Sequence, residues 1–245
     1  MRKHMLIIIF VGIIQIIFAI NPGEKLTFSI KYGMITAGHT VGEFKEDVYN
    51  DSIPCYTITS VSKTNAFFDK LYKVRDKIES RWDKKNLSSL YYYKQLNEGK
   101  YWQKRIHFFY PDQGFTMYWS YNRKTKKIKE KKFDIPQNTQ DVMSAIYWVR
   151  MQKFVVGDTL SVNVTSDGKS YVAKIKVIKK EKIKTVFGKK ECFLVEPQLD
   201  GEATFKYSAK MRIWFTADDK KIPVKMESIV IFGSFKIVLI KAENI

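Results

Sequence analysis

The chain has 245 residues, of which 45% are hydrophobic and 15% aromatic. Disordered and fibrous classes are excluded, because such chains are poor in apolar side chains or rich in Gly and Pro, and this one has 12 Gly and 6 Pro. The formal charge of +18 suits acidic partners, such as an anionic membrane surface or an acidic glycan. The alternative, which we favour, is a compositional bias toward Lys, because a phosphate-binding protein is expected to use more Arg.

The first residues predict an export signal. Arg2 and Lys3 precede an apolar run over residues 5–18, and the small Ala19 follows it. This order is typical of a secretory signal peptide, with cleavage expected after residue 19. An uncleaved anchor is the alternative, although the run is short for a membrane span of about 20 residues. We therefore expect a signal peptide over residues 1–19 and an exported protein of the periplasm or cell envelope, where nucleic acid is not an expected partner.

A two-residue rhythm dominates the rest of the chain. Leu26, Phe28 and Ile30, for example, alternate with polar residues. This alternation places one set of side chains in a core and the other in solvent, as in antiparallel sheets. Strands are expected over residues 25–33, 37–48, 54–64, 70–82, 88–97, 100–110, 114–121, 126–133, 159–166, 170–186, 190–199, 205–217, 222–231 and 234–243. So many strands rarely stay in one open sheet. We predict a mainly β antiparallel meander, as a barrel or strongly curled sheet, forming a single domain over residues 20–245.

One helix is expected near the middle of the chain. Between Thr139 and Gln152 the apolar residues follow a helical stripe. Asn138 or Thr139 can cap its start, and Asp141 lies where the helix dipole favours an acid. Asp141 and Arg150 are about 13–14 Å apart along such a helix and cannot pair. We expect a capping role for Asp141 and a carboxylate or carbonyl partner on the sheet for Arg150; ligand anchoring is the alternative for both.

Aromatic residues are unusually dense between residues 90 and 121. Adjacent rings on a strand face opposite ways, so both faces of this region carry rings. Core packing explains one face, and the other is a candidate cavity lining, glycan platform or membrane-interface surface. The candidate ligand-binding side chains are Tyr92, Trp102, Trp119, Asp141 and Arg150.

The two cysteines, Cys55 and Cys192, have two interpretations. An exported protein meets oxidising conditions, so a disulfide between them is one expectation. The alternative is a pair of buried thiols that behave as small apolar side chains. A cysteine nucleophile is less expected, because the residues after the signal peptide offer only His39 and His107 as bases.

The motifs of catalysis and metal binding are missing from the sequence. There is no Gly-x-Ser-x-Gly elbow and no Gly-rich phosphate loop. His and Cys are too few for a zinc site, and no acidic ladder suits Ca²⁺, so neither metal nor cofactor is expected. The expected function is a non-catalytic binding or scaffolding module for a lipidic or glycan ligand. The alternative is an envelope hydrolase or glycan-modifying enzyme with paired carboxylates at the barrel mouth.

Four stretches of the chain resemble a known family in their order and spacing. They are Tyr32-Gly33 with Thr36-Ala37-Gly38; Asp141-Val142-Met143-Ser144 through Tyr147 to Arg150, then Gly157-Asp158; Gly188 leading to Val195-Glu196-Pro197; and Trp214-Phe215-Thr216 with Asp218 and Pro223-Val224. On these residues the chain resembles the exported bacterial family DUF3108. The resemblance implies a periplasmic or envelope-facing β-barrel-like fold, and it implies no activity, since the family has none assigned.

Overall fold

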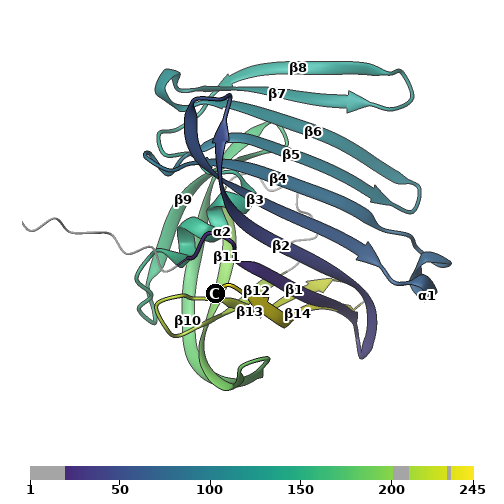
Figure 1. Ribbon diagram of the computed structural model, residues 1–245, viewed down its shortest axis with the longest axis vertical. Coiled ribbons are helices and arrows are strands. Elements are labelled where there is room, and N and C mark those ends of the chain that lie inside the picture. The colour runs from purple at the N-terminus through teal and green to yellow at the C-terminus, as the bar shows by residue number, and fades with distance from the viewer. Residues whose placement is uncertain (1–19, 201–209, 231–232) are drawn as a thin grey trace, which may run out of the picture.

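The computed structural model of the chain describes residues 20–200, 210–230 and 233–245. The expected signal peptide, residues 1–19, lies outside them. The described residues form one antiparallel sheet of 14 strands (Figure 1). Its strands are β1 (Lys25–Tyr32), β2 (Ile35–Tyr49), β3 (Ile53–Thr64), β4 (Arg75–Asp83), β5 (Ser89–Glu98), β6 (Tyr101–Tyr110), β7 (Phe115–Asn122), β8 (Lys127–Asp134), β9 (Thr159–Ser166), β10 (Lys169–Thr185), β11 (Gly188–Asp200), β12 (Lys210–Thr216), β13 (Pro223–Val230) and β14 (Gly233–Glu243). The prediction of a mainly β antiparallel meander is thus confirmed.

The meander begins and ends in the middle of the sheet. From β1 the chain adds neighbouring strands one by one out to β8, at one edge. The helix α2 (Val142–Arg150) then leads to β9 at the opposite edge, and the later strands return to β14. Because β14 pairs with β1 along the whole of β1, the two ends of the described chain meet. The side-chain amide of Asn244 donates a hydrogen bond of 3.1 Å to the carbonyl oxygen of Gly23.

The sheet is curled, and the segment before α2 joins its two halves. The backbone N–H of Gln140 donates to Asn163 of β9, and Thr165 of β9 donates back to Gln140, both at 2.8 Å. On the other side, the N–H of Ser89 on β5 donates to the carbonyl oxygen of Thr139 at 3.1 Å. The described strands form no ladder between β8 and β9. The curled sheet is therefore bridged at this end but not closed by strand pairing.

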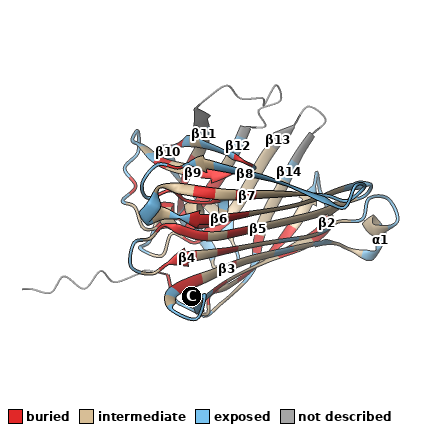
Figure 2. Ribbon diagram, turned by 90° about the horizontal axis from the view of Figure 1, so that it is seen from above, coloured by how far each residue is buried: buried red, intermediate tan, exposed pale blue. Residues whose placement is uncertain are grey.

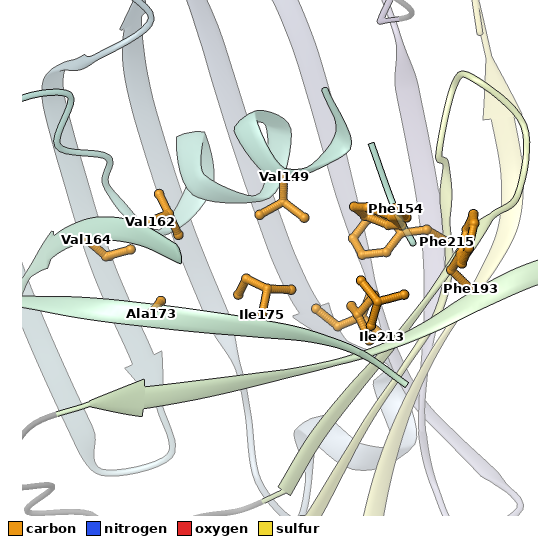
Figure 3. Packing of buried hydrophobic residues seen from close by; sticks show 11 residues of the cluster. Val149, Phe154, Val162, Val164, Ala173, Ile175, Phe193, Ile213 and Phe215 are labelled. Atoms are coloured by element: carbon orange, nitrogen blue, oxygen red, sulfur yellow. The ribbon is translucent and has the colours of Figure 1, made fainter. Parts of the chain in front are cut away.

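The helix α2 packs on the concave face of the sheet, against β3, β4 and β9 (Figure 1). Val149 and the following Phe154 point into a cluster with Ile175, Ile213 and Phe215 from the second half of the chain (Figure 3). The apolar stripe of the helix is thus buried as its period predicted. On β3 to β7 the buried residues gather at the strand ends nearer α2 (Figure 2).

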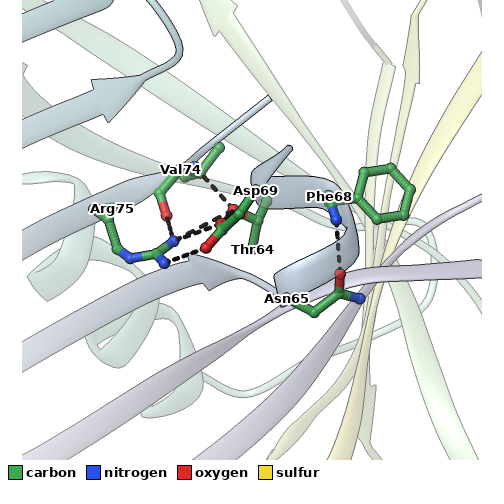
Figure 4. Close-up of polar contacts among 6 residues, drawn as sticks. All are labelled: Thr64, Asn65, Phe68, Asp69, Val74 and Arg75. Atoms are coloured by element: carbon green, nitrogen blue, oxygen red, sulfur yellow. Dashed lines mark hydrogen bonds and ion pairs between the residues drawn. The ribbon is translucent and has the colours of Figure 1, made fainter. Parts of the chain in front are cut away.

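A short helix that the sequence did not predict, α1 (Ala66–Asp69), separates β3 from β4. Asn65 caps it, and Asp69 accepts hydrogen bonds from both Arg75 Nη atoms (2.9 and 2.6 Å) and from the Thr64 hydroxyl (2.5 Å; Figure 4). The Arg75 bonds, and then that of Thr64, lower the pKa of Asp69 to about 2. The strand expected from residue 70 therefore begins later, at Arg75.

Candidate functional site

Asp141 is the N-cap of α2 and is fully buried. Its Oδ1 accepts the backbone N–H groups of Met143 (2.7 Å) and Ser144 (3.0 Å). Its Oδ2 accepts the hydroxyls of Ser80 on β4 (2.6 Å) and Ser89 on β5 (2.7 Å). Burial raises the pKa of this carboxyl, while the four hydrogen bonds oppose the rise. Asp141 is therefore a cap that ties the helix to two strands, and its carboxylate is fully occupied.

Arg150, at the other end of α2, is 1% exposed and pairs with Glu24, which is 2% exposed. Two parallel hydrogen bonds, Nη1 to Oε1 at 2.7 Å and Nη2 to Oε2 at 2.6 Å, form the pair. Arg150 also donates to the carbonyl oxygen of Lys220 at 3.2 and 3.3 Å. The guanidinium thus meets a carboxylate and a carbonyl, the kinds of partner expected from the sequence, but Glu24 and Lys220 lie just outside the strands rather than on the sheet. Arg150 thus fixes the C-terminal end of α2 to the residue just before β1 and to the turn before β13.

The predicted site does not assemble around the helix. Asp141 and Arg150 occupy opposite ends of α2, and both are saturated by structural bonds. Of the three aromatic candidates, Tyr92 on β5 is 1% exposed and lies on the concave face, where it pairs across the strands with Ser80 and His107. A ligand in bulk solvent cannot reach these three candidates without local opening of the fold.

Trp102 and Trp119 lie on the opposite, convex face. Cross-strand neighbours share a face, and Tyr92 and His107 are concave, so the adjacent Tyr91 and Phe108 are convex. Six rings of β2, β5, β6 and β7 make up what we call the outer aromatic strip. These are Tyr49, Tyr91, Phe108, Trp119, Tyr121 and Trp102.

The rings of the outer aromatic strip form two groups of contacting rings, one of four and one of two. The centroids of Tyr49 and Tyr91 are 6.3 Å apart, those of Tyr91 and Phe108 5.5 Å, and those of Phe108 and Trp119 4.9 Å. Tyr121, two residues after Trp119 on β7, continues the strip to the Trp102 ring at 5.5 Å. All six rings are partly exposed. The strip is therefore a partly exposed aromatic surface on the convex face, whose two groups of contacting rings meet along β7 at Trp119 and Tyr121.

Charged groups border this strip. Arg81 on β4 pairs across the strands with Tyr91 and forms ion pairs with Glu79 (3.0 Å) and Asp47 (2.7 Å). The side chains of Arg81 and Glu79 are 23% and 18% exposed. Lys77 bonds Glu79 at 3.0 Å from the other side. A planar donor and two carboxylates thus lie beside a row of rings.

The expected disulfide is not formed. Cys55 on β3 and Cys192 on β11 are both free, and both are fully buried. In the sheet order β2, β1, β14, β13 and β12 lie between these two strands. Burial raises the pKa of each thiol to about 11, so neither is a thiolate at neutral pH. The second interpretation, two apolar thiols, describes this structure.

Two shallow hollows of about 360 Å³ each are among those that the described residues form. One lies beside Asp218 and Lys220, and the other beside Pro54 and Asp83, so neither contains a candidate residue. Within the described ranges no three His, Cys, Asp or Glu side chains are grouped to hold a metal ion. No α-helix in the same part of the chain has both the length and the hydropathy to cross a bilayer.

Sequence reasoning missed three parts of this arrangement. The sequence did not indicate a role for Glu24, because its partner, Arg150, is 126 residues away. His107 was considered only as a base for a cysteine, yet it is fully buried beside the turn at Asp167. Tyr49 lies outside the dense aromatic region and joins the strip only because β2 and β5 share the convex face. The alternation of side chains along the strands could have placed Tyr92 and Trp119 on opposite faces of the sheet. It could not have told which of these faces is concave.

Comparison with known proteins shows which family the chain resembles. The model of a family described as proteins of unknown function, DUF3108, matches residues 27–240, which is nearly the whole described sheet. The chain belongs to the DUF3108 family. The resemblance inferred from the four sequence stretches is thereby confirmed. No curated protein is significantly similar to this DUF3108 sequence.

Solved structures are similar to this DUF3108 chain to different degrees. A β-barrel-like protein of the domain of unknown function DUF1849 from Brucella abortus superposes with a TM-score of 0.60 at 11% identity, over 91% of this chain and 98% of that one. A protein of Parabacteroides distasonis ATCC 8503, provisionally described as a lipoprotein, gives 0.38 at 10% identity, over 91% and 96%. A protein of Bacteroides fragilis NCTC 9343 with a YmcC-like fold, provisionally described as exported, gives 0.35 at 10%, over 91% and 96%. At these identities the first likeness supports the fold alone.

Proposed function

We propose that this DUF3108 chain is an exported, non-catalytic binding module that holds a glycan on the outer aromatic strip. The observation that carries the proposal is the run of contacting, partly exposed rings from Tyr49 to Trp119, bordered by the Arg81 ion pairs. Sugars present an apolar ring face that stacks on aromatic rings, while their hydroxyls need fixed donors and acceptors. The strip and its border supply both.

A glycan fits this surface better than a lipid tail does. An acyl chain is stabilised where a concave apolar site removes most of its surface from water. The outer aromatic strip is on the convex face, and Glu79, Arg81 and Asp47 border it with charge. Although a compositional bias toward Lys explains the formal charge of +18, that charge still attracts a glycan that carries acidic groups. Headgroups of an anionic membrane would share that charge preference, and the experiment below separates the two sources.

A non-catalytic role fits the buried ionisable groups of the concave face. The carboxylate of Asp141 accepts four hydrogen bonds, and Glu24 is paired with Arg150. General acid–base work needs a group that is free to exchange a proton with substrate, and these groups hold α2 in place instead. An exported location is supported by the apolar run over residues 5–18, which follows Arg2 and Lys3.

Co-sedimentation with insoluble cell-wall sacculi tests the proposal, with vesicles containing phosphatidylglycerol as the competing probe. We expect the protein to pellet with sacculi, and Trp119→Ala and Tyr91→Ala each to weaken binding at least about fivefold, because stacking contributes on the order of 1 kcal/mol or more per ring. Phe235→Ala is the matched control, since Phe235 is a 42% exposed ring on β14, outside the strip.

Circular dichroism must show that each variant keeps the β fold. Binding to vesicles but not to sacculi would replace the glycan by a lipid surface. Equal binding by the Trp119 and Phe235 variants would show that the strip is not the site. Binding to neither probe would contradict the proposal for acidic envelope components altogether.

A further inference from the structure

The turn between β9 and β10 docks on strands from the other half of the chain. This turn, Asp167-Gly168, has positive φ at both residues, as a tight two-residue hairpin requires. β9 is one edge of the sheet, and the turn contacts β5, β6, β7 and β8, up to the opposite edge. The contact therefore joins strands that are remote in the sheet order.

Ionic contacts hold the side chain of Asp167. Lys94 on β5 lies 2.5 Å from one carboxylate oxygen, and Arg105 on β6 lies 2.8 Å from the same oxygen. Burial opposes ionisation, but the bonds and charges of Lys94 and Arg105 prevail and lower the pKa of Asp167. This carboxylate thus stays charged in mildly acidic solution.

The backbone of Gly168 is held from both sides. Its carbonyl oxygen accepts a bond of 3.0 Å from Lys131 on β8, and its N–H donates at 3.2 Å to Nε2 of His107 on β6. The ring of Tyr118 on β7 lies against the same residue, since a Cβ placed on Gly168 would be 2.9 Å from its ring atoms. The turn is therefore surrounded by charged, aromatic and imidazole groups, and we call this set the seat. It comprises Lys94, Arg105, His107, Tyr118 and Lys131.

The bond from Gly168 fixes the protonation of His107. Nε2 accepts, so the ring proton is on Nδ1, which donates to the hydroxyl of Thr116 at 3.3 Å. Thr116 in turn donates to the carbonyl oxygen of Phe108 at 3.0 Å. A second proton on the ring would point at the N–H of Gly168, so the protonated ring and the seated turn exclude each other.

Burial is the main reason why His107 resists a second proton, and the charges around the ring act in both directions. Two of the nearest cations, Lys94 and Arg105, oppose its charge, and Asp167 alone among the acids acting on the ring favours it. The titratable or charged groups that face the seat are Tyr92 and Lys94 from β5, Arg105 from β6, Tyr118 from β7, Lys131 from β8, Asp167 from the turn and Tyr171 from β10. Burial lowers the pKa of the imidazole to about 4.

We propose that the turn at Asp167-Gly168 is an acid-released clasp: when His107 takes up a second proton, the turn leaves its seat and this end of the curled sheet opens. A released turn exposes the ring to water and restores its ordinary affinity for protons. Protons therefore bind the released state more tightly, and acid shifts the population toward it. An exported protein meets the pH of its surroundings, which gives such a device a stimulus.

Hydrogen exchange at pH 7.0 and 4.5, corrected for intrinsic rates, tests the clasp. With a pKa near 6.5 when released and about 4 when seated, the open-to-seated ratio should rise about 60-fold between these pH values. We expect the amides of residues 164–171 to lose protection by that order, while those of β1 and β14 keep theirs. His107→Gln, which can still accept from Gly168 but cannot titrate, should remove the difference.

The matched control is His39→Gln, because His39 lies on β2, outside the seat, and should leave the acid response unchanged. Unchanged protection of residues 164–171 at pH 4.5, or equal losses at β1 and β14, would overturn the clasp. So would an unaltered acid response in His107→Gln. If that variant does not fold, nuclear magnetic resonance of the unaltered protein decides: the His107 ring should titrate near pH 4 together with the exchange, and titration near 6.5 would refute the proposal.

Discussion

Glu24 and Arg150, 126 residues apart in sequence, form a two-point ion pair in which neither side chain is more than 2% exposed. A lone buried charge is strongly disfavoured, so Arg150→Met should lower the free energy of unfolding by about 3–5 kcal/mol. Replacing both residues by Met should recover much of that loss, because no charge then remains buried. Urea unfolding followed by tryptophan fluorescence measures both changes. Lys241→Met, which breaks the exposed pair with Glu243, should change stability by less than about 1 kcal/mol.

The cap at Asp141 should be the sensitive point of α2. Asp141→Ala removes the cap and leaves the buried hydroxyls of Ser80 and Ser89 without their acceptor. Loss of the cap costs about 1 kcal/mol and the orphaned hydroxyls about 1–3 kcal/mol, so we expect roughly 3 kcal/mol in thermal or urea unfolding. Asn65→Ala, at the cap of the short exposed α1, is the comparison and should cost about 1 kcal/mol. Equal losses of stability in Asp141→Ala and Asn65→Ala would contradict a stabilising role for the buried hydrogen bonds around Asp141.

The two cysteines should react only slowly with thiol reagents until the protein unfolds. Both are buried with a pKa of about 11, and thiol reagents attack the exposed thiolate. We expect Cys55 and Cys192 to react with a coloured disulfide reagent at least about 100-fold more slowly in the folded protein than in urea. Adding a reductant should leave the midpoint of thermal unfolding unchanged. A fall in that midpoint on reduction would instead indicate a bridge.

Alanine substitutions at Gly168 and Gly114 should distinguish the cost of backbone strain from the cost of steric crowding by a neighbouring side chain. Both have positive φ, at +78° and +70°, but a Cβ on Gly168 would meet the ring of Tyr118, and one on Gly114 meets nothing within 4 Å. Gly114→Ala should therefore cost only the strain of the left-handed conformation, about 1–2 kcal/mol. Gly168→Ala should cost about 1–3 kcal/mol more, because the turn must move from the ring. Chemical denaturation compares the two, and equal losses would mean that Tyr118 yields freely.

The strand pattern of this fold could be predicted because each strand carries its own signal. Alternation at Leu26 and Phe28 reports a buried face whatever the partner strand is. The helix at residues 142–150 was equally visible, since its apolar period of 3.6 is local. The short helix at 66–69 was not, because its cap at Asn65 and the ion pair of Asp69 with Arg75 involve only a few residues between two strand-like segments.

The candidate site was predictable only in part, because it depends on distances across the sheet. The roles of Asp141 and Arg150 followed from helix geometry, but Glu24 could not be named as the partner. Aromatic density at residues 90–121 pointed to the right strands, yet parity alone does not reveal which face holds α2. As a result Tyr92 and Trp119 were grouped together, although the structure places them on opposite faces.

Pairing of β1 with β14 places the first and last described strands side by side in the middle of the sheet. A peptide linker between residues 245 and 20 would span a short gap, since Asn244 already bonds Gly23. New ends could then be cut in the exposed turn that joins β7 to β8, at residues 123–126. Such a circular permutant would begin the meander at an edge, and its folding rate would reveal how much of the barrier comes from uniting the first and last strands.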